Sequence, residues 1–374
     1  MASEPLSSPP STMEQDRTTG WPADCPRPPA KEEDLGFARR PMVDWLAPKE
    51  LASTGLRAAM AAVFGAYADK REVQAALHPL GEPQDLYEDY SQVPADQPFW
   101  LDYAADTGDG FDATYAMGWL LSRESVAADG AEVPLPRGRL LVLGGDQVYP
   151  TANREEYQNR FSGPLRAAFP WAPEDRVPHL YAIPGNHDWY DGLTSFTRLF
   201  CQKRWVGGWQ TRQKRSYFAL KLPRGWWLWG TDIQLSADID LPQMQFFQAV
   251  AAEMKKQAAE AGDGPPRLLL CTAQPQWVYC DVDPPGERTA PRRGCRLRVD
   301  PEEFSSLDYF HRDVIAANGI ELAAMLSGDL HHYTRYEKAP GQPTSPSTPS
   351  QLITSGGAGA YLLLTGVAFN LEYL

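Results

Sequence analysis

The sequence of 374 residues predicts an α/β fold, because short apolar runs alternate with segments of helical periodicity. The clearest apolar run covers residues 139–146 and reads Arg-Leu-Leu-Val-Leu-Gly-Gly-Asp, which is typical of a buried strand. Residues 177–183 form a second run, which stops at a Pro-Gly turn. Turns of this kind gather polar groups at the carboxyl ends of strands, where open α/β sheets bind ligands.

The composition predicts a globular protein of a reducing compartment. Hydrophobic residues make up 43% of the chain, which is enough for a full core. The formal charge of −13 repels duplex nucleic acid and anionic membranes, so a site for phosphate needs local positive charge. The amino terminus has no apolar signal segment, and we expect neither secretion nor a membrane span. We expect a cytoplasmic protein with reduced thiols, since the five cysteines are widely spaced and include no Cys-x-x-Cys pair.

The chain is expected to divide into three regions. Residues 1–33 are rich in Pro, Ser, Thr and charge, and they predict a disordered tail. Residues 34–92 are expected to form a helical extension, and residues 93–374 the main domain. Within the extension, residues 46–77 carry apolar side chains at helical spacing that we expect to pack against the domain, namely Leu51, Met60, Val63, Phe64 and Tyr67.

The main domain is predicted to alternate strands, polar turns and helices. Strands are expected at residues 99–106, 139–146, 177–183, 216–222, 225–231, 267–273, 320–327 and 352–359. Helices are expected at residues 113–122, at residues 304–318 and after Pro242, where the inward positions are Met244, Phe247, Val250 and Met254. Two inserts, at about residues 189–215 and 281–303, interrupt this pattern.

Four short polar fragments follow predicted strands, and together they indicate a metal site. They are Asp106-Thr-Gly, Gly-Gly-Asp146-Gln-Val-Tyr149, Gly-Asn186-His187-Asp188 and Gly-Asp329-Leu-His331-His332. Two divalent ions about 3.5–4 Å apart clamp a phosphate ester and generate hydroxide near neutral pH. Such a pair needs a bridging carboxylate and terminal Asp, Asn and His ligands at converging strand ends. One Asp after one strand is usually a turn residue, whereas the four fragments together favour a metal site.

Through these fragments, roughly residues 95–360 resemble the calcineurin-like metallophosphoesterase superfamily, in the variant that is similar to purple acid phosphatases. The resemblance implies a four-layer α/β/β/α sandwich with its site at the carboxyl ends of the strands. It implies a first metal on Asp106 and His331 with Tyr149 as a further ligand, Asp146 as the bridge, and Asn186 on the second metal. It also implies that His187 is the general acid, with its pKa and tautomer set by Asp188. The alternative for His187 and His331 is a structural role in a turn.

The chain departs from the superfamily pattern at two positions. Gln274 and Asp329 stand where the superfamily usually has two histidines of the second metal site. Asp329 can ligate through oxygen and Gln274 is a weak donor, so we expect one or two divalent ions, with Mn²⁺ or Mg²⁺ favoured over Fe or Zn²⁺. His332 is an alternative ligand, although its place next to His331 would point it to the other face of a strand. Otherwise we expect His332 to contact substrate.

The first insert reverses the sign of the charge. Between Gly192 and Asp232 there is no acidic residue, and the basic residues are Arg198, Lys203, Arg204, Arg212, Lys214, Arg215, Lys221 and Arg224. With the aromatic residues between them, they are expected to form a wall for substrate, in which Arg212 and Arg215 meet phosphate oxygens. The alternative is a solvated helix face with aromatic residues in the core.

The sequence therefore predicts a metal-dependent phosphoric ester hydrolase that acts on a phosphomonoester or phosphodiester, in a small molecule or a phosphoprotein. The alternative is a regulator on the same fold that binds phosphate or a nucleotide and has weakened catalysis, which Gln274 and Asp329 favour. The identity of the substrate depends on the inserts and loops rather than on the metal ligands.

Overall fold

The structure is a computed structural model, and it describes residues 32–64, 70–81, 85–94, 97–128, 131–171, 177–233, 239–262, 264–278, 306–338, 349–360 and 367–370. Over these residues the chain is a mixed α/β protein with a seven-stranded sheet, a six-stranded sheet and a pair of short strands. Residues 1–31 of the predicted tail and the second predicted insert, residues 281–303, lie outside the described residues. Within the described ranges, no helix is long and apolar enough to cross a membrane.

The seven-stranded sheet carries most strands of the carboxyl-terminal half. In spatial order its strands are β1 (Glu88–Asp89), β9 (Phe218–Lys221), β10 (Trp226–Gly230), β11 (Arg267–Cys271), β12 (Glu321–Ser327), β14 (Gln351–Ser355) and β13 (Tyr333–Glu337). Strands β10, β11, β12 and β14 are parallel. Strand β9 runs parallel to β1 and antiparallel to β10, and β13 runs antiparallel to β14. The apolar runs predicted as strands β10, β11 and β12 are therefore confirmed, and they lie side by side.

The six-stranded sheet carries the strands that precede the first three polar fragments. In spatial order its strands are β15 (Val367–Asn370), β2 (Trp100–Ala104), β5 (Leu140–Leu143), β6 (His179–Ala182), β8 (Trp209–Thr211) and β7 (Trp205–Val206). Strands β2, β5, β6 and β8 are parallel, so their carboxyl ends lie at one edge. A separate antiparallel pair consists of β3 (Ser125–Val126) and β4 (Leu135–Pro136).

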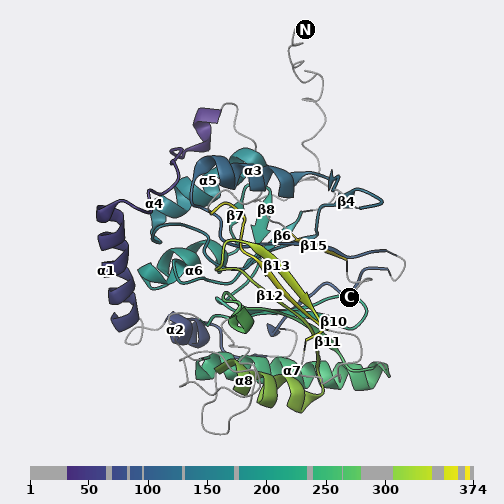
Figure 1. Cartoon of the computed structure of the whole chain (residues 1–374). Helices are drawn as coiled ribbons and strands as arrows, with labels where there is room; N and C mark the ends of the chain where they lie inside the picture. Colours follow the sequence, from purple (N-terminus) through teal and green to yellow (C-terminus); the bar gives the residue numbers. More distant parts are fainter. Residues whose placement is uncertain are drawn as a thin grey trace, which may run out of the picture.

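The two large sheets face each other across a shared apolar cluster. Tyr103, Val142 and Tyr181 enter this cluster from the six-stranded sheet, and Leu228 and Leu269 enter it from the seven-stranded sheet. Helices cover the two outer sides of this pair of sheets (Figure 1). Those beside the six-stranded sheet are α3 (Phe111–Ser122), α4 (Arg154–Glu156), η3 (Tyr157–Ser162), α5 (Gly163–Ala168) and α6 (Thr194–Phe200). Those beside the seven-stranded sheet are α7 (Leu241–Ala261), α8 (Ser306–Phe310), η6 (His311–Ile315) and η7 (Ala316–Asn318).

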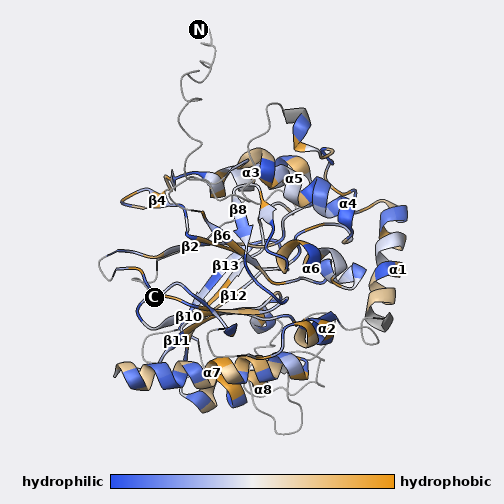
Figure 2. Cartoon of the chain, turned by 180° about the vertical axis from the view of Figure 1, so that it is seen from behind, coloured by the Kyte–Doolittle hydropathy of each residue, from blue (hydrophilic) through white to orange (hydrophobic). Residues whose placement is uncertain are grey.

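Helix α7 forms where its sequence signals predicted it. The Asp240 side chain accepts a hydrogen bond from the backbone N–H of Gln243, and Pro242 lies in the first turn. Gly262 ends the helix with φ 69°, the left-handed conformation that glycine adopts without a steric cost. The predicted inward positions Met244, Phe247, Val250 and Met254 are all buried against the seven-stranded sheet. The helical periodicity therefore identified the buried face correctly, and Figure 2 shows that the helix carries both polar and apolar residues.

The expectation for the helical extension is only partly correct. The extension forms the helices α1 (Pro48–Phe64) and α2 (Lys70–Leu77). Leu51 and Met60 on α1 are 57% and 49% exposed, so their predicted packing is wrong. The physical reason is that α1 lies at the edge of the molecule, where it borders the short helix η4 (Asp188–Asp191) rather than a sheet (Figure 1). The side chains of Val63 and Phe64, and residue Tyr67, lie outside the described part.

Polar contacts hold the extension on both halves of the fold. Near the six-stranded sheet, the Val43 N–H donates to Asp109 Oδ1 over 2.9 Å. Near the seven-stranded sheet, buried Arg71 donates to the Asp232 carbonyl over 3.0 Å and pairs with Asp240 at 3.1 Å. Strand β1 then pairs with β9, so the end of the predicted extension is part of the seven-stranded sheet.

The first predicted insert is built into the six-stranded sheet. Residues 189–215 form helix α6 and strands β7 and β8, and β8 pairs in parallel with β6. Phe196 and Trp209 are buried in the cluster under this sheet. The aromatic residues of the insert therefore supply core, as the alternative interpretation of this segment expected.

Candidate metal centre

The polar fragments lie at strand ends that are hydrogen-bonded to one another. Asp106 follows β2, and its backbone N–H donates to the Gly145 carbonyl, which follows β5, over 3.0 Å. The turn after β12 is tied to the turn after β11, because the Gly328 N–H donates to the Ala273 carbonyl over 3.1 Å. Ala358, beyond β14, donates in turn to the Ala105 carbonyl over 3.0 Å. Both sheets therefore contribute to one set of linked turns, as the spacing of the fragments predicted.

The hydroxyl of Tyr149 gathers three of the predicted metal ligands. It donates to Asp106 Oδ1 at 3.1 Å and to Asp146 Oδ2 at 3.3 Å. The same oxygen lies 3.0 Å from His331 Nε2. Tyr149, Asp106 and Asp146 are buried and His331 is half-buried, so two carboxylates, a phenol and an imidazole share a small enclosed volume.

One carboxylate oxygen in this cluster has no protein partner. Asp106 Oδ2 is buried without a hydrogen bond in the described part of the chain. Two glycines make room for it, because a Cβ on Gly356 would lie 2.2 Å from this oxygen and one on Gly328 would lie 3.1 Å away. A buried carboxylate oxygen without a partner costs folding free energy, so it is a position where a bound cation would stabilise the protein.

The backbone holds the ligand residues in an uncommon conformation. Asp106, Asp146, Asp329 and His331 have φ of 60°, 50°, 70° and 49°. Residues other than glycine rarely adopt positive φ, and each instance costs about 1 kcal/mol or more. Four such residues at neighbouring turns mean that the surrounding fold imposes these side-chain directions against local preference.

The carboxylates of the cluster favour their neutral forms when no cation is present. Burial, followed by repulsion from Asp146 and Asp329, raises the pKa of Asp106 well above its ordinary value. Burial and the charge of Asp329 raise the pKa of Asp146 to about 7. Burial lowers the pKa of His331 to about 4. A divalent cation reverses this balance, because it favours ionised carboxylates and neutral imidazole.

His187 takes its orientation from a carbonyl rather than from Asp188, so the expected role of Asp188 is corrected. His187 Nδ1 lies 2.6 Å from the Pro150 carbonyl, and a carbonyl accepts, so this nitrogen carries the proton. Burial lowers the pKa of His187 to about 4, although the bond to Pro150 acts in the opposite direction. The ring packs against Trp45, Tyr149 and Tyr190. The neutral imidazole therefore leaves Nε2 as its unprotonated nitrogen.

Asp188 instead orders the backbone of two site turns. Its Oδ2 accepts from the Gly185 N–H at 2.8 Å, and the Gln147 N–H lies 3.3 Å from its Oδ1. The Tyr157 hydroxyl donates to Oδ1 over 2.5 Å. Burial and the charge of Asp146 raise the pKa of Asp188 well above its ordinary value. No signal in the sequence pointed to Tyr157, because it lies 31 residues away in a segment with no motif.

The residues predicted for a second metal are less well gathered. The Asn186 amide donates from Nδ2 to the Tyr190 hydroxyl over 3.0 Å, which leaves its Oδ1 for a ligand. Asp329 faces Asp106 and Asp146 closely enough to raise the pKa values of both. The backbone carbonyl of Gln274 accepts from the Thr272 hydroxyl over 3.0 Å. His332 Nδ1 lies 2.6 Å from the backbone carbonyl of Leu330. His332 thus bonds to its own turn.

The donor set is compatible with an oxygen-preferring divalent cation. In the described ranges, no group of three or more His, Cys, Asp or Glu residues is placed to hold a metal ion. The candidate site also uses a phenol, from Tyr149, and an amide oxygen, from Asn186. Neither Tyr nor Asn is among the four residue types His, Cys, Asp and Glu. The partnerless Oδ2 of Asp106 and the closely spaced carboxylates of Asp106 and Asp146 fit Mn²⁺ or Mg²⁺ by their chemistry.

The two arginines predicted to bind substrate are engaged by the extension instead. Arg212 lies 3.4 Å from Glu88, with which it forms an ion pair. Arg215 is 6% exposed and donates to the His78 carbonyl. Both guanidinium groups therefore have structural partners between the first insert and residues 78–88, and these contacts do not direct them toward the Tyr149 cluster.

No known family model matches the sequence, and no curated protein matches it. Among solved structures, the chain is similar to one described as GAP50, the anchor in the inner membrane complex of Plasmodium. The sequence identity is 12%, and the match covers 70% of this chain and 72% of that chain with a TM-score of 0.42. A similarity at this level carries no argument about what this chain does.

Proposed function

We propose that the chain is a metal-dependent phosphoesterase of the calcineurin-like type, which cleaves a phosphomonoester or phosphodiester by attack of water on phosphorus. The observation that carries the proposal is the Tyr149 hydroxyl, within 3.3 Å of Asp106, Asp146 and His331. The proposed architecture is the four-layer α/β/β/α sandwich. Its support is the set of three apolar clusters, one between the sheets and one beneath the helices on each outer side.

In this proposal Asp106, Tyr149 and His331 would hold the first divalent ion. Asp146 would be shared with a second ion, for which Asn186 and Asp329 would be the other ligands and Gln274 a weak further donor. When bound, the ions supply positive charge to the phosphate and lower the pKa of the attacking water. The protein's own contribution is to fix the donors, and the positive φ of Asp106 and Asp146 shows that their directions are imposed by the fold.

His187 is proposed to move the proton. Its Nδ1 is bonded to the Pro150 carbonyl, so Nε2 is the atom that passes a proton to the leaving-group oxygen as the phosphorus–oxygen bond breaks. The free site favours neutral imidazole because of burial. An anionic phosphate beside the ring favours the protonated form, so the substrate itself would charge the acid. Asp188 is proposed as a positioning residue, because it fixes the backbone of the His187 turn.

The test is an assay with an aryl phosphate and a bis-aryl phosphate in Mn²⁺, Mg²⁺ and Zn²⁺. We expect turnover that EDTA abolishes and that Asp146→Asn lowers at least about 100-fold, because the variant loses the bridging charge. Asp313→Asn is the matched control, since Asp313 is a surface residue paired with Arg312. Turnover that persists in EDTA, or full activity in Asp146→Asn, would exclude the proposal.

The second candidate is a regulator that binds phosphate or a nucleotide on the same fold with weakened catalysis. The neutral side chains of Asn186 and Gln274 favour this candidate, because they leave the second metal position poor in charge. Metal analysis of the purified protein separates the two. Two tightly bound ions favour the enzyme, whereas one ion or none, together with measurable binding of phosphate, favours the regulator.

A further inference from the structure

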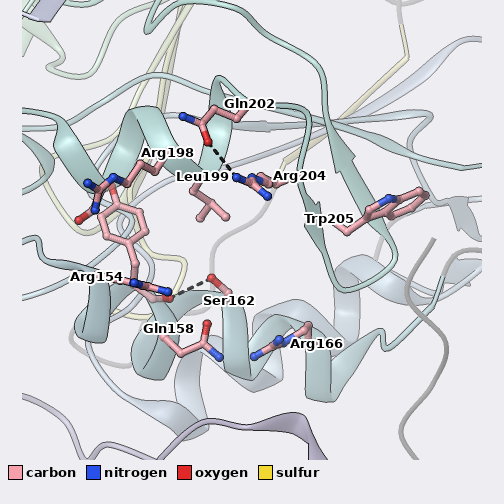
Figure 3. Close-up of a pocket in the computed structure, with 11 residues that line it drawn as sticks. Arg154, Gln158, Ser162, Arg166, Arg198, Leu199, Gln202, Arg204 and Trp205 are labelled. Carbon is pink, nitrogen blue, oxygen red and sulfur yellow. Dashed lines mark hydrogen bonds between the residues drawn. The ribbon is translucent and has the colours of Figure 1, made fainter. Parts of the chain in front are cut away.

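A cavity lined by four arginines lies between the helices of the six-stranded sheet and its edge. Its volume is about 580 Å³, which is within the usual range for small-molecule sites. Arg154 and Arg166 come from the run α4–η3–α5, and Arg198 and Arg204 come from α6 and the turn before β7 (Figure 3). Among the described residues, its lining includes no Asp or Glu. In a chain of formal charge −13, this arrangement concentrates positive charge in one concave place.

Several donors in this cavity have no partner. Arg166 Nε and Nη2 and the indole Nε1 of Trp205 are buried without a hydrogen bond to any residue that the structure describes. Burial lowers the pKa of Arg166, which means that the site holds this charge at a cost. Arg160, in η3 of the same helical run, does have partners. It pairs with Glu156 and donates to the Pro41 carbonyl. Unpaired buried guanidinium donors are costly, so their presence beside a cavity indicates an anion that completes them.

The remaining lining favours an organic polyphosphate over a single small anion. Four guanidinium groups carry four positive charges, which exceed the charge of about −2 on one phosphate group. Ser162, Ser195 and Gln158 add neutral hydrogen-bonding groups to the wall. Leu199 and the half-buried Trp205 provide an apolar side. A ring attached to a short chain of phosphates meets both features, because the ring can pack on the indole and the phosphates on the arginines.

The cavity is distinct from the metal centre but adjoins it through one side chain. Its lining includes none of Asp106, Asp146, Asn186 or His331. Tyr157 belongs to the lining, and its hydroxyl donates to Asp188, which fixes the Gly185 turn. Ser195, also in the lining, is held by Asp191 of the helix that follows the His187 turn. An occupant of the cavity therefore contacts residues that order the backbone beside the metal centre.

We propose that this cavity binds a compact organic polyphosphate of the nucleoside triphosphate class, at a site separate from the metal centre. Arg154, Arg166, Arg198 and Arg204 pair with the phosphate oxygens, and Trp205 contacts the ring. The proposal does not depend on the proposed hydrolysis, because it concerns binding to residues outside the Tyr149 cluster.

The test is calorimetric titration of the full chain in EDTA with ATP, AMP and inorganic tripolyphosphate. EDTA removes divalent ions, so the metal centre does not contribute and failure of one proposal leaves the other intact. We expect ATP and tripolyphosphate to bind with an affinity that falls as salt rises, and AMP to bind at least about tenfold more weakly. Equal binding of ATP and tripolyphosphate would assign recognition to the phosphates alone and overturn the nucleoside part.

The variants Arg166→Gln and Arg198→Gln should each weaken tripolyphosphate binding about tenfold or more, since each removes charge-assisted hydrogen bonds. Arg335→Gln is the matched control, because Arg335 is an exposed arginine paired with Glu337 on β13. Equal losses in all three variants, or no binding by the wild-type chain, would overturn the proposal.

Thermal unfolding is a second measurement, and it distinguishes loss of ligand binding from a folding defect. Arg166→Gln should raise the Tm without ligand, because it removes an unpaired buried charge, and tripolyphosphate should raise the wild-type Tm by mass action. A lower Tm for Arg166→Gln would mean that this guanidinium has a structural partner, and it would also contradict the proposal.

Discussion

The carboxylate of Asp106 occupies a space that excludes even one added methyl group. A Cβ at Gly356 would lie 2.2 Å from the Oδ2 atom of Asp106 and 2.9 Å from the backbone nitrogen of His331. Contacts this short force a displacement of backbone or of the carboxylate, because neither atom belongs to the flexible end of a long side chain. The glycine after β14 is therefore required by the site, although no metal ligand lies there.

We expect Gly356→Ala to displace Asp106 and to lower the proposed metal binding and the proposed phosphoesterase activity about tenfold or more. Gly264→Ala is the control, because a Cβ there meets nothing within 4 Å. The measurements are metal content of the purified variants and turnover of the aryl phosphate. Wild-type metal content in Gly356→Ala would show that Asp106 is not a ligand.

At the residue scale, the sequence predicted which residues meet but not what some of them do. The fragments around Asp106, Asp146 and His331 predicted their convergence, because each follows a strand and parallel strands end at a common edge. The partners of Asp188 and Arg215 were missed, since they depend on contacts across 31 and 137 residues that no local pattern encodes.

At the element scale, α1 and α7 have similar periodicity and opposite environments. Met60 on α1 is 49% exposed, whereas Met254 on α7 is 1% exposed. Periodicity identifies a helix and its apolar stripe, but whether a sheet lies against that stripe depends on the path of the chain. For the same reason, strands β7 and β8, which have two and three residues, were not recognisable as members of the six-stranded sheet.

The contrast between Met254 and Met60 predicts different changes in the free energy of unfolding when each is replaced by alanine. Met254→Ala should lower the free energy of unfolding by about 2–5 kcal/mol, because it leaves a cavity beneath the seven-stranded sheet. Met60→Ala should change it by no more than about 0.5 kcal/mol, because the side chain is already in solvent. Urea unfolding of both variants measures the difference. A large loss for Met60→Ala would indicate that α1 is covered in solution.

At the scale of the whole molecule, buried histidines contribute a loss of stability in acid, which the raised pKa values of the buried carboxylates Asp106 and Asp188 oppose. Burial lowers the pKa of His311 to about 4 from 6.5. Between these values the unfolded chain binds more protons than the folded chain, so stability falls as the pH drops from 6.5 toward 4. His187 and His331 shift in the same direction for the same cause.

The variant His311→Gln isolates the contribution of His311 to the pH dependence of stability, because glutamine does not titrate. We expect the wild type to lose about 1–2 kcal/mol more stability than the variant between pH 7 and pH 5. Urea unfolding at the two pH values measures this difference. Parallel losses in the two proteins would mean that His311 is accessible to protons in the folded state.

The docking of the extension on both halves of the fold has a consequence for biosynthesis. Arg71 leaves the ribosome before its partners Asp232 and Asp240, which are made more than 160 residues later. At about 5–20 residues per second, the segment waits on the order of ten seconds or more for these partners. Helix α2 has only eight residues, and isolated helices shorter than about 12 residues are marginal in water. Helix α2 is thus translated well before the residues that secure it, and until then a nascent-chain chaperone has access to its apolar side chains.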